Sequence, residues 1–206
     1  MGWITVCQGV KGKLKKGEER NGVGIDGYLK ANLDGIPSFL KKGYDCVGII
    51  SGMSKVRIGK STLAIGTVGT YIAWILAGGR VKCHQETRDN KEVWITDSVR
   101  LPKKQINWNL KENVCFSAED LQNTAFKLYN KYGKGQVIVY DEGRQGLDSA
   151  RAMESINKGM EDFFQTCGFM GHVILIVLPS FFKLHEDYAV ARSLFLINVY
   201  ADKNYN

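Results

Sequence analysis

The sequence predicts an α/β fold with a mainly parallel sheet that is covered by helices on both faces. Strand-like and helix-like segments alternate along the chain from residue 45 onward. Two strand-like segments, Gln136–Asp141 and His172–Leu178, are nearly continuous apolar runs, typical of strands buried on both faces of a parallel sheet. A third, Cys46–Ile50, leads through a loop into a long uncharged helical segment. Such alternation is the pattern of a parallel sheet with helices packed on each side.

The chain has 206 residues, enough for one well-buried domain and too short for two ordinary ones. We divide it into a basic, glycine-rich N-terminal extension over 1–44 and a main domain over 45–206. Within the extension, Trp3–Cys7 predicts a short strand. Asp26–Leu40 has a weak helical pattern that a glycine and a proline interrupt.

Composition limits the compartment and the partners. The net charge of +7 favours an anionic partner such as nucleic acid, although a solvated basic surface explains it equally well. The five cysteines are scattered, without a C-x-x-C motif, which indicates a reducing compartment with no disulfide framework and no zinc site. We therefore expect a cytoplasmic protein, in the host cytoplasm if the chain is viral.

One uncharged stretch has the length of a short membrane span. Thr62–Gly79 contains no charged residue, and about 18 apolar residues can suffice to cross a bilayer. The stretch directly follows Lys60-Ser61, however, and a helix that is apolar all round can simply be buried in a protein core. We predict a buried helix and no membrane span.

The middle of the chain predicts short strands before the next helix. Gly78-Gly79 is a stop signal for the uncharged helix. Arg80–His84 and Glu92–Thr96 follow as two short strands around the turn residues Arg88–Lys91. Leu101–Leu110 has no clear period and is predicted to be a loop, and Asn113–Phe116 a short strand.

The second half continues the alternation. Ser117 is predicted to cap a helix that runs to about Tyr132 and ends at Gly133. The remaining predicted elements are an amphipathic helix over Asp148–Cys167, a short helix over Phe181–Ala191 and a final buried strand over Leu194–Val199.

The segment Gly59-Lys60-Ser61-Thr62 carries the chemistry of a phosphate-binding P-loop, or Walker A motif. Backbone N–H groups at a helix start bind phosphate oxygens. Lys60 would place a charge on the terminal phosphates, and the Ser61 hydroxyl would ligate Mg²⁺. The usual first glycine of the motif is replaced by Ser54, with Gly52 two residues earlier. The predicted nucleotide-binding residues are Gly52, Ser54, Lys55, Arg57, Ile58, Gly59, Lys60, Ser61 and Thr62. A chance match in a surface turn is the alternative.

Two adjacent carboxylates end the strand at Gln136–Asp141. Asp141 suits a water-mediated contact to Mg²⁺, as in a Walker B motif, and Glu142 suits a base that activates the attacking water. A polar strand end that caps a turn is the alternative interpretation. Because the pair follows a P-loop, we predict that it is catalytic.

With these motifs and the later strand His172–Leu178, the chain resembles ATPases of the additional-strand P-loop group, with a RecA/FtsK-like sheet. Within that group it is similar to virus- and plasmid-borne relatives of FtsK/HerA DNA pumps and to Zot-like phage assembly ATPases. The resemblance implies that a further strand separates the two motif strands. It implies ATP on Gly59–Thr62, Mg²⁺ on Ser61 and Asp141, and water activation by Glu142.

The resemblance also implies a homo-oligomeric ring and an arginine finger donated by a neighbouring subunit. Arg192 is the first candidate and Arg144 the second, and either could instead be a surface or ion-pair arginine. Ser180 is the best match to the polar sensor residue of the group. No loop that tracks DNA can be identified in the sequence.

We therefore predict an Mg²⁺-dependent ATPase that moves or packages double-stranded DNA, encoded by a virus or a mobile element. A nucleotide or small-molecule kinase is one alternative. Another is an assembly or partition protein with little turnover, of Zot-like or ParA-like kind, since Lys55 has the spacing of the ParA signature lysine. The chain has no guanine-specifying Asn-Lys-x-Asp, which disfavours a GTPase.

Overall fold

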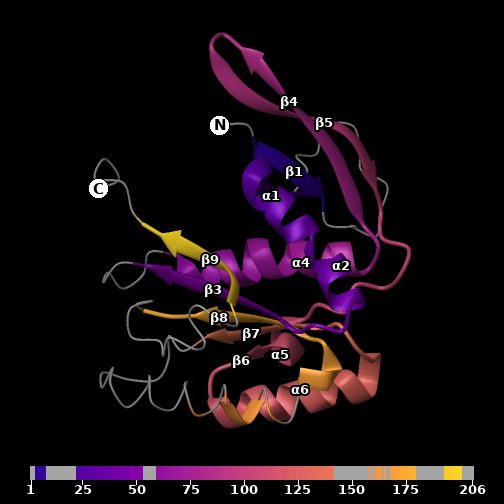
Figure 1. Cartoon of the computed structure of the whole chain (residues 1–206), viewed down its shortest axis with the longest axis vertical. Helices are drawn as coiled ribbons and strands as arrows, with labels where there is room; N and C mark the ends of the chain where they lie inside the picture. The colour runs from indigo at the N-terminus through magenta and orange to yellow at the C-terminus, as the bar shows by residue number, and fades with distance from the viewer. Residues whose placement is uncertain are drawn as a thin grey trace.

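A five-stranded, entirely parallel sheet forms the centre of the protein (Figure 1). The computed structural model describes residues 3–7, 22–52, 59–141, 158, 161–163, 165, 168–179 and 193–200. The strand order is β6-β7-β8-β3-β9, and each neighbouring pair is parallel. The strands are β3 (Cys46–Gly52), β6 (Val114–Cys115), β7 (Val137–Asp141), β8 (Val173–Val177) and β9 (Ser193–Val199). The strand order therefore places β8 between β3 and β7.

Helices cover both faces of this sheet (Figure 1). One face packs on the N-terminal helices and on the helical run that follows β3, and the other packs on α6. Side chains of β8 alternate between the two layers, with Leu175 in the first core cluster and Ile174 and Ile176 in the second. The helices are α1 (Gly27–Asp34), α2 (Ile36–Lys41), α3 (Lys60–Thr62), η1 (Leu63–Gly69), α4 (Thr70–Leu76) and α6 (Ala118–Tyr132). The predicted α/β arrangement, a parallel sheet between two helical layers, is confirmed.

The uncharged stretch after β3 is helical from α3 to α4, with a π-helical segment, η1, in the middle. In α4 the side chains of Tyr71 and Trp74 are almost fully buried and stack on one another. The helix ends just before the predicted stop, since Gly78 has a φ of 99° and the Gly79 N–H donates to the carbonyl of Trp74 at 3.1 Å. Within the described residues, no helix combines the length and apolar character that a membrane crossing needs.

A long antiparallel hairpin projects from the body of the protein (Figure 1). Its strands, β4 (Arg80–Arg88) and β5 (Lys91–Arg100), are longer than predicted. Asp89 and Asn90 form the turn with φ of 51° and 57°, the left-handed conformations of a tight hairpin turn. One face of the hairpin contacts α1, where the Trp94 and Tyr28 rings meet edge to face at 5.6 Å.

The described part of the N-terminal extension packs on the same core. β1 (Trp3–Cys7) pairs antiparallel with β2 (Gly22–Asp26), and the helical pattern breaks at Gly35 as predicted. Leu33 of α1 and Ile36 of α2 are fully buried against the layer that contains α4. The two N-terminal helices are thus part of one helical layer of the protein.

The predicted final strand is present as β9, but the prediction that it is buried was wrong. β9 lies at the edge of the sheet, and Leu194 and Leu196 are 42% and 45% exposed. Phe195 points to the covered side, where it lies so close to Gly48 of β3 that a Cβ there would come within 2.2 Å of the Phe195 ring. Along β9, partly buried and exposed residues alternate, so within the described residues the Leu194 and Leu196 face is the open one.

Two other elements differ from the prediction or lie beyond the described residues. The predicted loop before β6 ends in a short helix, α5 (Leu110–Asn113), which the Asn109 side chain caps by accepting from the N–H of Lys111 at 2.9 Å. Most of the helix predicted over Asp148–Cys167, and all of the one over Phe181–Ala191, lies outside the described residues.

The ends of α6 follow the sequence signals. The Ser117 hydroxyl oxygen accepts from the N–H of Asp120 at 3.1 Å, which satisfies one of the free donors of the first turn. Gly133 follows the last helical residue with φ of 80°, a conformation that glycine adopts without a steric penalty. The predicted cap and stop are both confirmed.

His172 connects α6, β7 and β8 in the interior. Its side chain is buried, Nδ1 accepts from the N–H of Gln136 at 3.0 Å, and Nε2 donates to the carbonyl of Ala125 at 3.1 Å. These bonds require the neutral ring with its proton on Nε2. Burial lowers the pKa of His172 below its usual value of 6.5.

Replacing His172 with asparagine is expected to reduce the pH dependence of stability. The lowered pKa means that the His172 contribution is complete above about pH 6.5 and is lost as the pH falls through the folded-state pKa. In urea unfolding, the free energy of unfolding of the wild type should thus fall as the pH is lowered from about 7.5 to 5. The fall should be smaller for His172→Asn. At the upper pH the variant should be less stable by about 1–3 kcal/mol. A pH dependence of the unfolding free energy that is the same in His172→Asn as in the wild type would contradict this role.

Candidate functional site

The ends of β3 and β7 meet at one edge of the sheet. Asp141, the last residue of β7, pairs with Val177 of β8, and Val177 pairs with Ile50 of β3. Because all these strands are parallel, their carboxyl ends lie at the same edge, where α/β proteins commonly bind ligands. Gly52 at the end of β3 and Asp141 at the end of β7 therefore lie on either side of β8, at the same edge of the sheet.

Gly59 begins the helical run with a left-handed backbone. Its φ and ψ are 85° and 15°, and its carbonyl accepts from the N–H of Leu63 at 2.8 Å. A Cβ at this position would meet nothing within 4 Å, so the backbone angle, and not a lack of space, favours glycine. Gly59 has no side chain that could cap the helix, which leaves the N–H groups of the first turn for an anion.

The electrostatics of Lys60 place it in the same site as Asp141. The Lys60 side chain is partly buried, and Asp141 is only 7% exposed. Desolvation lowers the pKa of Lys60, and the charge of Asp141 opposes that shift by favouring the ammonium form. An ammonium at a helix start and a buried carboxylate at a strand end thus act on one another across the edge of the sheet.

The remaining predicted site residues divide into those that the structure describes and those that it does not. Gly52 is buried at the end of β3, Ser61 is partly buried beside Lys60, and Thr62 is exposed. The other predicted residues lie outside the described residues, and these are Ser54, Lys55, Arg57, Ile58, Glu142, Arg144, Ser180 and Arg192.

Two of the described residues at this edge carry oxygen donors of the kind that Mg²⁺ prefers. The hydroxyl of Ser61 and the carboxylate of Asp141 are hard oxygen ligands at the predicted place. Among the described residues, no group of three or more His, Cys, Asp or Glu side chains gathers as a metal site. Mg²⁺ commonly takes one or two protein oxygens, with phosphates and waters completing its shell.

The π-helical segment behind Lys60 was not predicted. The Thr70 hydroxyl donates to the carbonyl of Ile65, five positions earlier, at 3.0 Å, and π-helical turns are frequent at functional sites. Against the same segment, Trp108 packs so closely on Gly69 that a Cβ there would come within 2.6 Å of its ring. The uncharged stretch and its glycines carry no signal that separates a π-helix from an α-helix.

Comparison with protein-family models and with curated proteins finds no match for this chain. The resemblance to additional-strand ATPases therefore stays an expectation. The case for a function depends on the residues and the geometry at the carboxyl edge of the sheet.

Substitution of Gly59 and of Gly66 by alanine should change stability in opposite directions. Gly59→Ala places a Cβ on a left-handed backbone and should lower the free energy of unfolding by about 1–2 kcal/mol. Gly66 lies in the helical run, where an added Cβ would meet nothing within 4 Å, so Gly66→Ala should stabilise by about 0.5–1 kcal/mol. Chemical denaturation of both variants measures the difference. Equal effects would mean that the backbone at Gly59 is not left-handed.

Proposed function

We propose that this protein is an Mg²⁺-dependent P-loop ATPase with a RecA/FtsK-like fold, and that it acts on double-stranded DNA. The observation that carries the proposal is the placement of the Gly59–Lys60 helix start after β3 and of the buried Asp141 at the end of β7, on either side of β8 at the carboxyl edge of the sheet. The position of β8 between the two motif strands supports it, because that strand order is the one implied by the resemblance.

The residues of the edge have complementary roles in phosphate chemistry. The N–H groups after Gly59 and the ammonium of Lys60 bind the triphosphate and stabilise charge on its terminal phosphate. Ser61 and Asp141 would hold an Mg²⁺ ion, which would neutralise charge on the phosphate oxygens. Glu142, next to Asp141 in sequence, accepts a proton from the water that attacks in line.

The basic charge of the chain, +7, supports a polyanionic partner such as DNA. An ATPase of this kind would work as a homo-oligomeric ring, in which Arg192 or Arg144 of one subunit contacts the nucleotide of the next. Sizing of the purified chain with and without ATP tests that assembly.

Replacing Lys60 with alanine should weaken ATP binding by about 10- to 100-fold, the loss of one charged contact to phosphate, and abolish hydrolysis. Binding can be measured by calorimetry with the Mg²⁺ complex of a non-hydrolysable ATP analogue. Lys82→Ala is the matched control, since Lys82 is exposed on the projecting hairpin. Equal affinities for Lys60→Ala and Lys82→Ala would reject a nucleotide site at the helix start.

Replacing Glu142 with glutamine should preserve ATP binding and reduce turnover by about 10²–10⁴-fold, since the base that activates water is lost. Phosphate release, measured with and without double-stranded DNA, checks both the hydrolysis and its stimulation. Normal turnover by Glu142→Gln would remove Glu142 from the mechanism. Phosphate transfer to a nucleoside monophosphate without DNA would instead identify a kinase, and ATP binding without turnover an assembly protein.

A further inference from the structure

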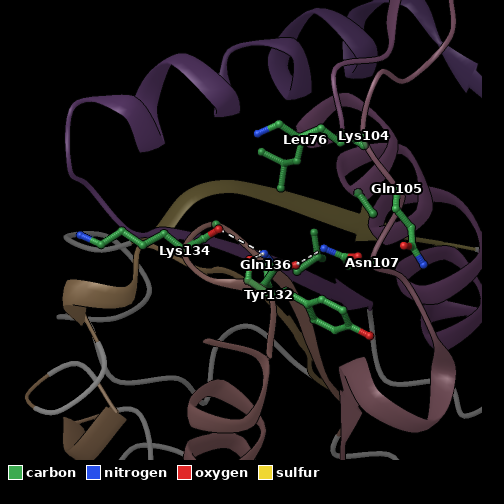
Figure 2. Close-up of a pocket in the computed structure, with 11 residues that line it drawn as sticks. Leu76, Lys104, Gln105, Asn107, Tyr132, Lys134 and Gln136 are labelled. Atoms are coloured by element: carbon green, nitrogen blue, oxygen red, sulfur yellow. Dashed lines mark hydrogen bonds between the residues drawn. The ribbon is translucent and has the colours of Figure 1, made fainter. Parts of the chain in front are cut away.

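A polar pocket lies at the edge of the sheet opposite to Lys60 and Asp141. It has a volume of about 240 Å³ and opens to solvent beside the end of α4 and the start of β7 (Figure 2). Leu76 is the last residue of α4 and Val137 the first of β7. The candidate nucleotide site lies at the start of the helical run that α4 ends, and at the last residue of β7. The described lining residues are Ala73, Leu76, Ala77, Lys104, Gln105, Asn107, Tyr132, Lys134, Gly135, Gln136 and Val137.

The chemistry of the lining suits an anion. Two lysines, three side-chain amides and a phenol face the pocket, and no carboxylate is among the described lining residues. The side chains of Lys104 and Lys134 are exposed, and their ammonium ends extend toward the same side of the view in Figure 2. Two cations that rise from different segments beside one opening can contact phosphates of one polyanion.

Hydrogen bonds hold the backbone beneath both lysines. The Gln136 amide nitrogen donates to the carbonyl of Lys134 at 3.1 Å, and its oxygen accepts from Asn107 at 3.4 Å (Figure 2). On the other side, the N–H groups of Lys103 and Lys104 both donate to the carbonyl of Ala77 at 3.1 Å. The sheet and α4 therefore set the backbone positions from which the two lysine side chains extend.

Further lysines extend the positive charge beyond the pocket. Lys103 is exposed next to Lys104, and Lys41 and Lys42 are exposed at the end of α2. That end of α2 lies beside the pocket, because Leu40 is 3.8 Å from the place of a Cβ on Gly135.

Glu112, an acidic residue that contacts the lining, is already paired. Glu112 accepts from the Tyr132 hydroxyl at 3.1 Å and forms an ion pair with Lys131 at 2.7 Å. Asp45, which follows the end of α2 in sequence, is partly buried. The exposed side chains of this edge are therefore predominantly basic.

We propose that this amino-terminal edge of the sheet binds the phosphodiester backbone of a nucleic acid. Lys104 and Lys134 contact phosphates at the pocket, and Lys41, Lys42 and Lys103 continue the contact along the edge. Small-molecule sites are usually concave, mostly apolar and largely enclosed. An open, polar pocket within a row of exposed lysines fits a chain of phosphates that passes across the surface, which is the main source of sequence-independent binding.

This inference rests on the proposed function only for the choice of DNA as the probe. The two sites lie at opposite edges of the sheet and can fail separately. Lys60→Ala should weaken ATP binding and leave DNA binding unchanged. Lys104→Ala/Lys134→Ala should leave ATP binding unchanged and weaken DNA binding.

The test measures fluorescence anisotropy of labelled single- and double-stranded oligonucleotides over a range of salt concentrations. Lys104→Ala/Lys134→Ala should weaken duplex binding by about tenfold and reduce the slope of log affinity against log salt by about 2, close to 0.9 per lost phosphate contact. The control Lys82→Ala/Arg88→Ala removes the same charge from the hairpin, where both side chains are exposed, and should change affinity by less than about twofold. Thermal unfolding of both double variants checks that they fold.

Three outcomes would overturn the proposal. The pocket variant could bind oligonucleotides as tightly as the wild type, or the control pair could lose as much affinity, which would indicate a diffuse basic surface. Inorganic phosphate could shift the Gln136 side-chain amide signals in nuclear magnetic resonance while oligonucleotides leave them unchanged, which would indicate a small-anion site instead.

Discussion

The placement of β8 between β3 and β7 is the constraint on which the rest of the structure depends. Every residue of β8 is buried, and its backbone bonds both neighbours in register. Because β8 pairs with both neighbours, it fixes the distance between β3 and β7 and the register in which their ends lie. The Lys60 ammonium and the Asp141 carboxylate can interact only because β8 sets those ends at one edge.

The two edges of the sheet therefore have different chemistry. At the carboxyl edge, a helix start and a buried carboxylate form a partly desolvated site, in which burial lowers the pKa of Lys60 and the charge of Asp141 opposes that shift. At the amino edge, His172 and Gln136 satisfy the buried backbone groups, and the lysines remain in solvent. The first edge suits phosphate chemistry, and the second suits attachment of a polyanion.

Much of the fold and the described part of the candidate site followed from local signals. The apolar runs at β7 and β8 predicted buried parallel strands, and Ser117 predicted the start of α6. Gly59-Lys60 and Asp141 were identified from motif spacing, and the structure brings their elements to one edge. The exposure of β9 could not be predicted, since its alternation of large apolar side chains fits a covered strand equally well. Within the described residues, no helix covers the face that carries Leu194 and Leu196, which are 42% and 45% exposed.

The sequence by itself determined the type of most elements, the phosphate-binding chemistry after β3 and the carboxylate at the end of β7. Those properties depend on periodicity, caps and residue types that act over a few neighbouring positions. The tertiary structure alone decided the π-helical form of η1, the length of the hairpin and the pocket between Lys104 and Lys134. Each of these depends on packing between segments far apart in the chain, where no local pattern records which side chains will meet.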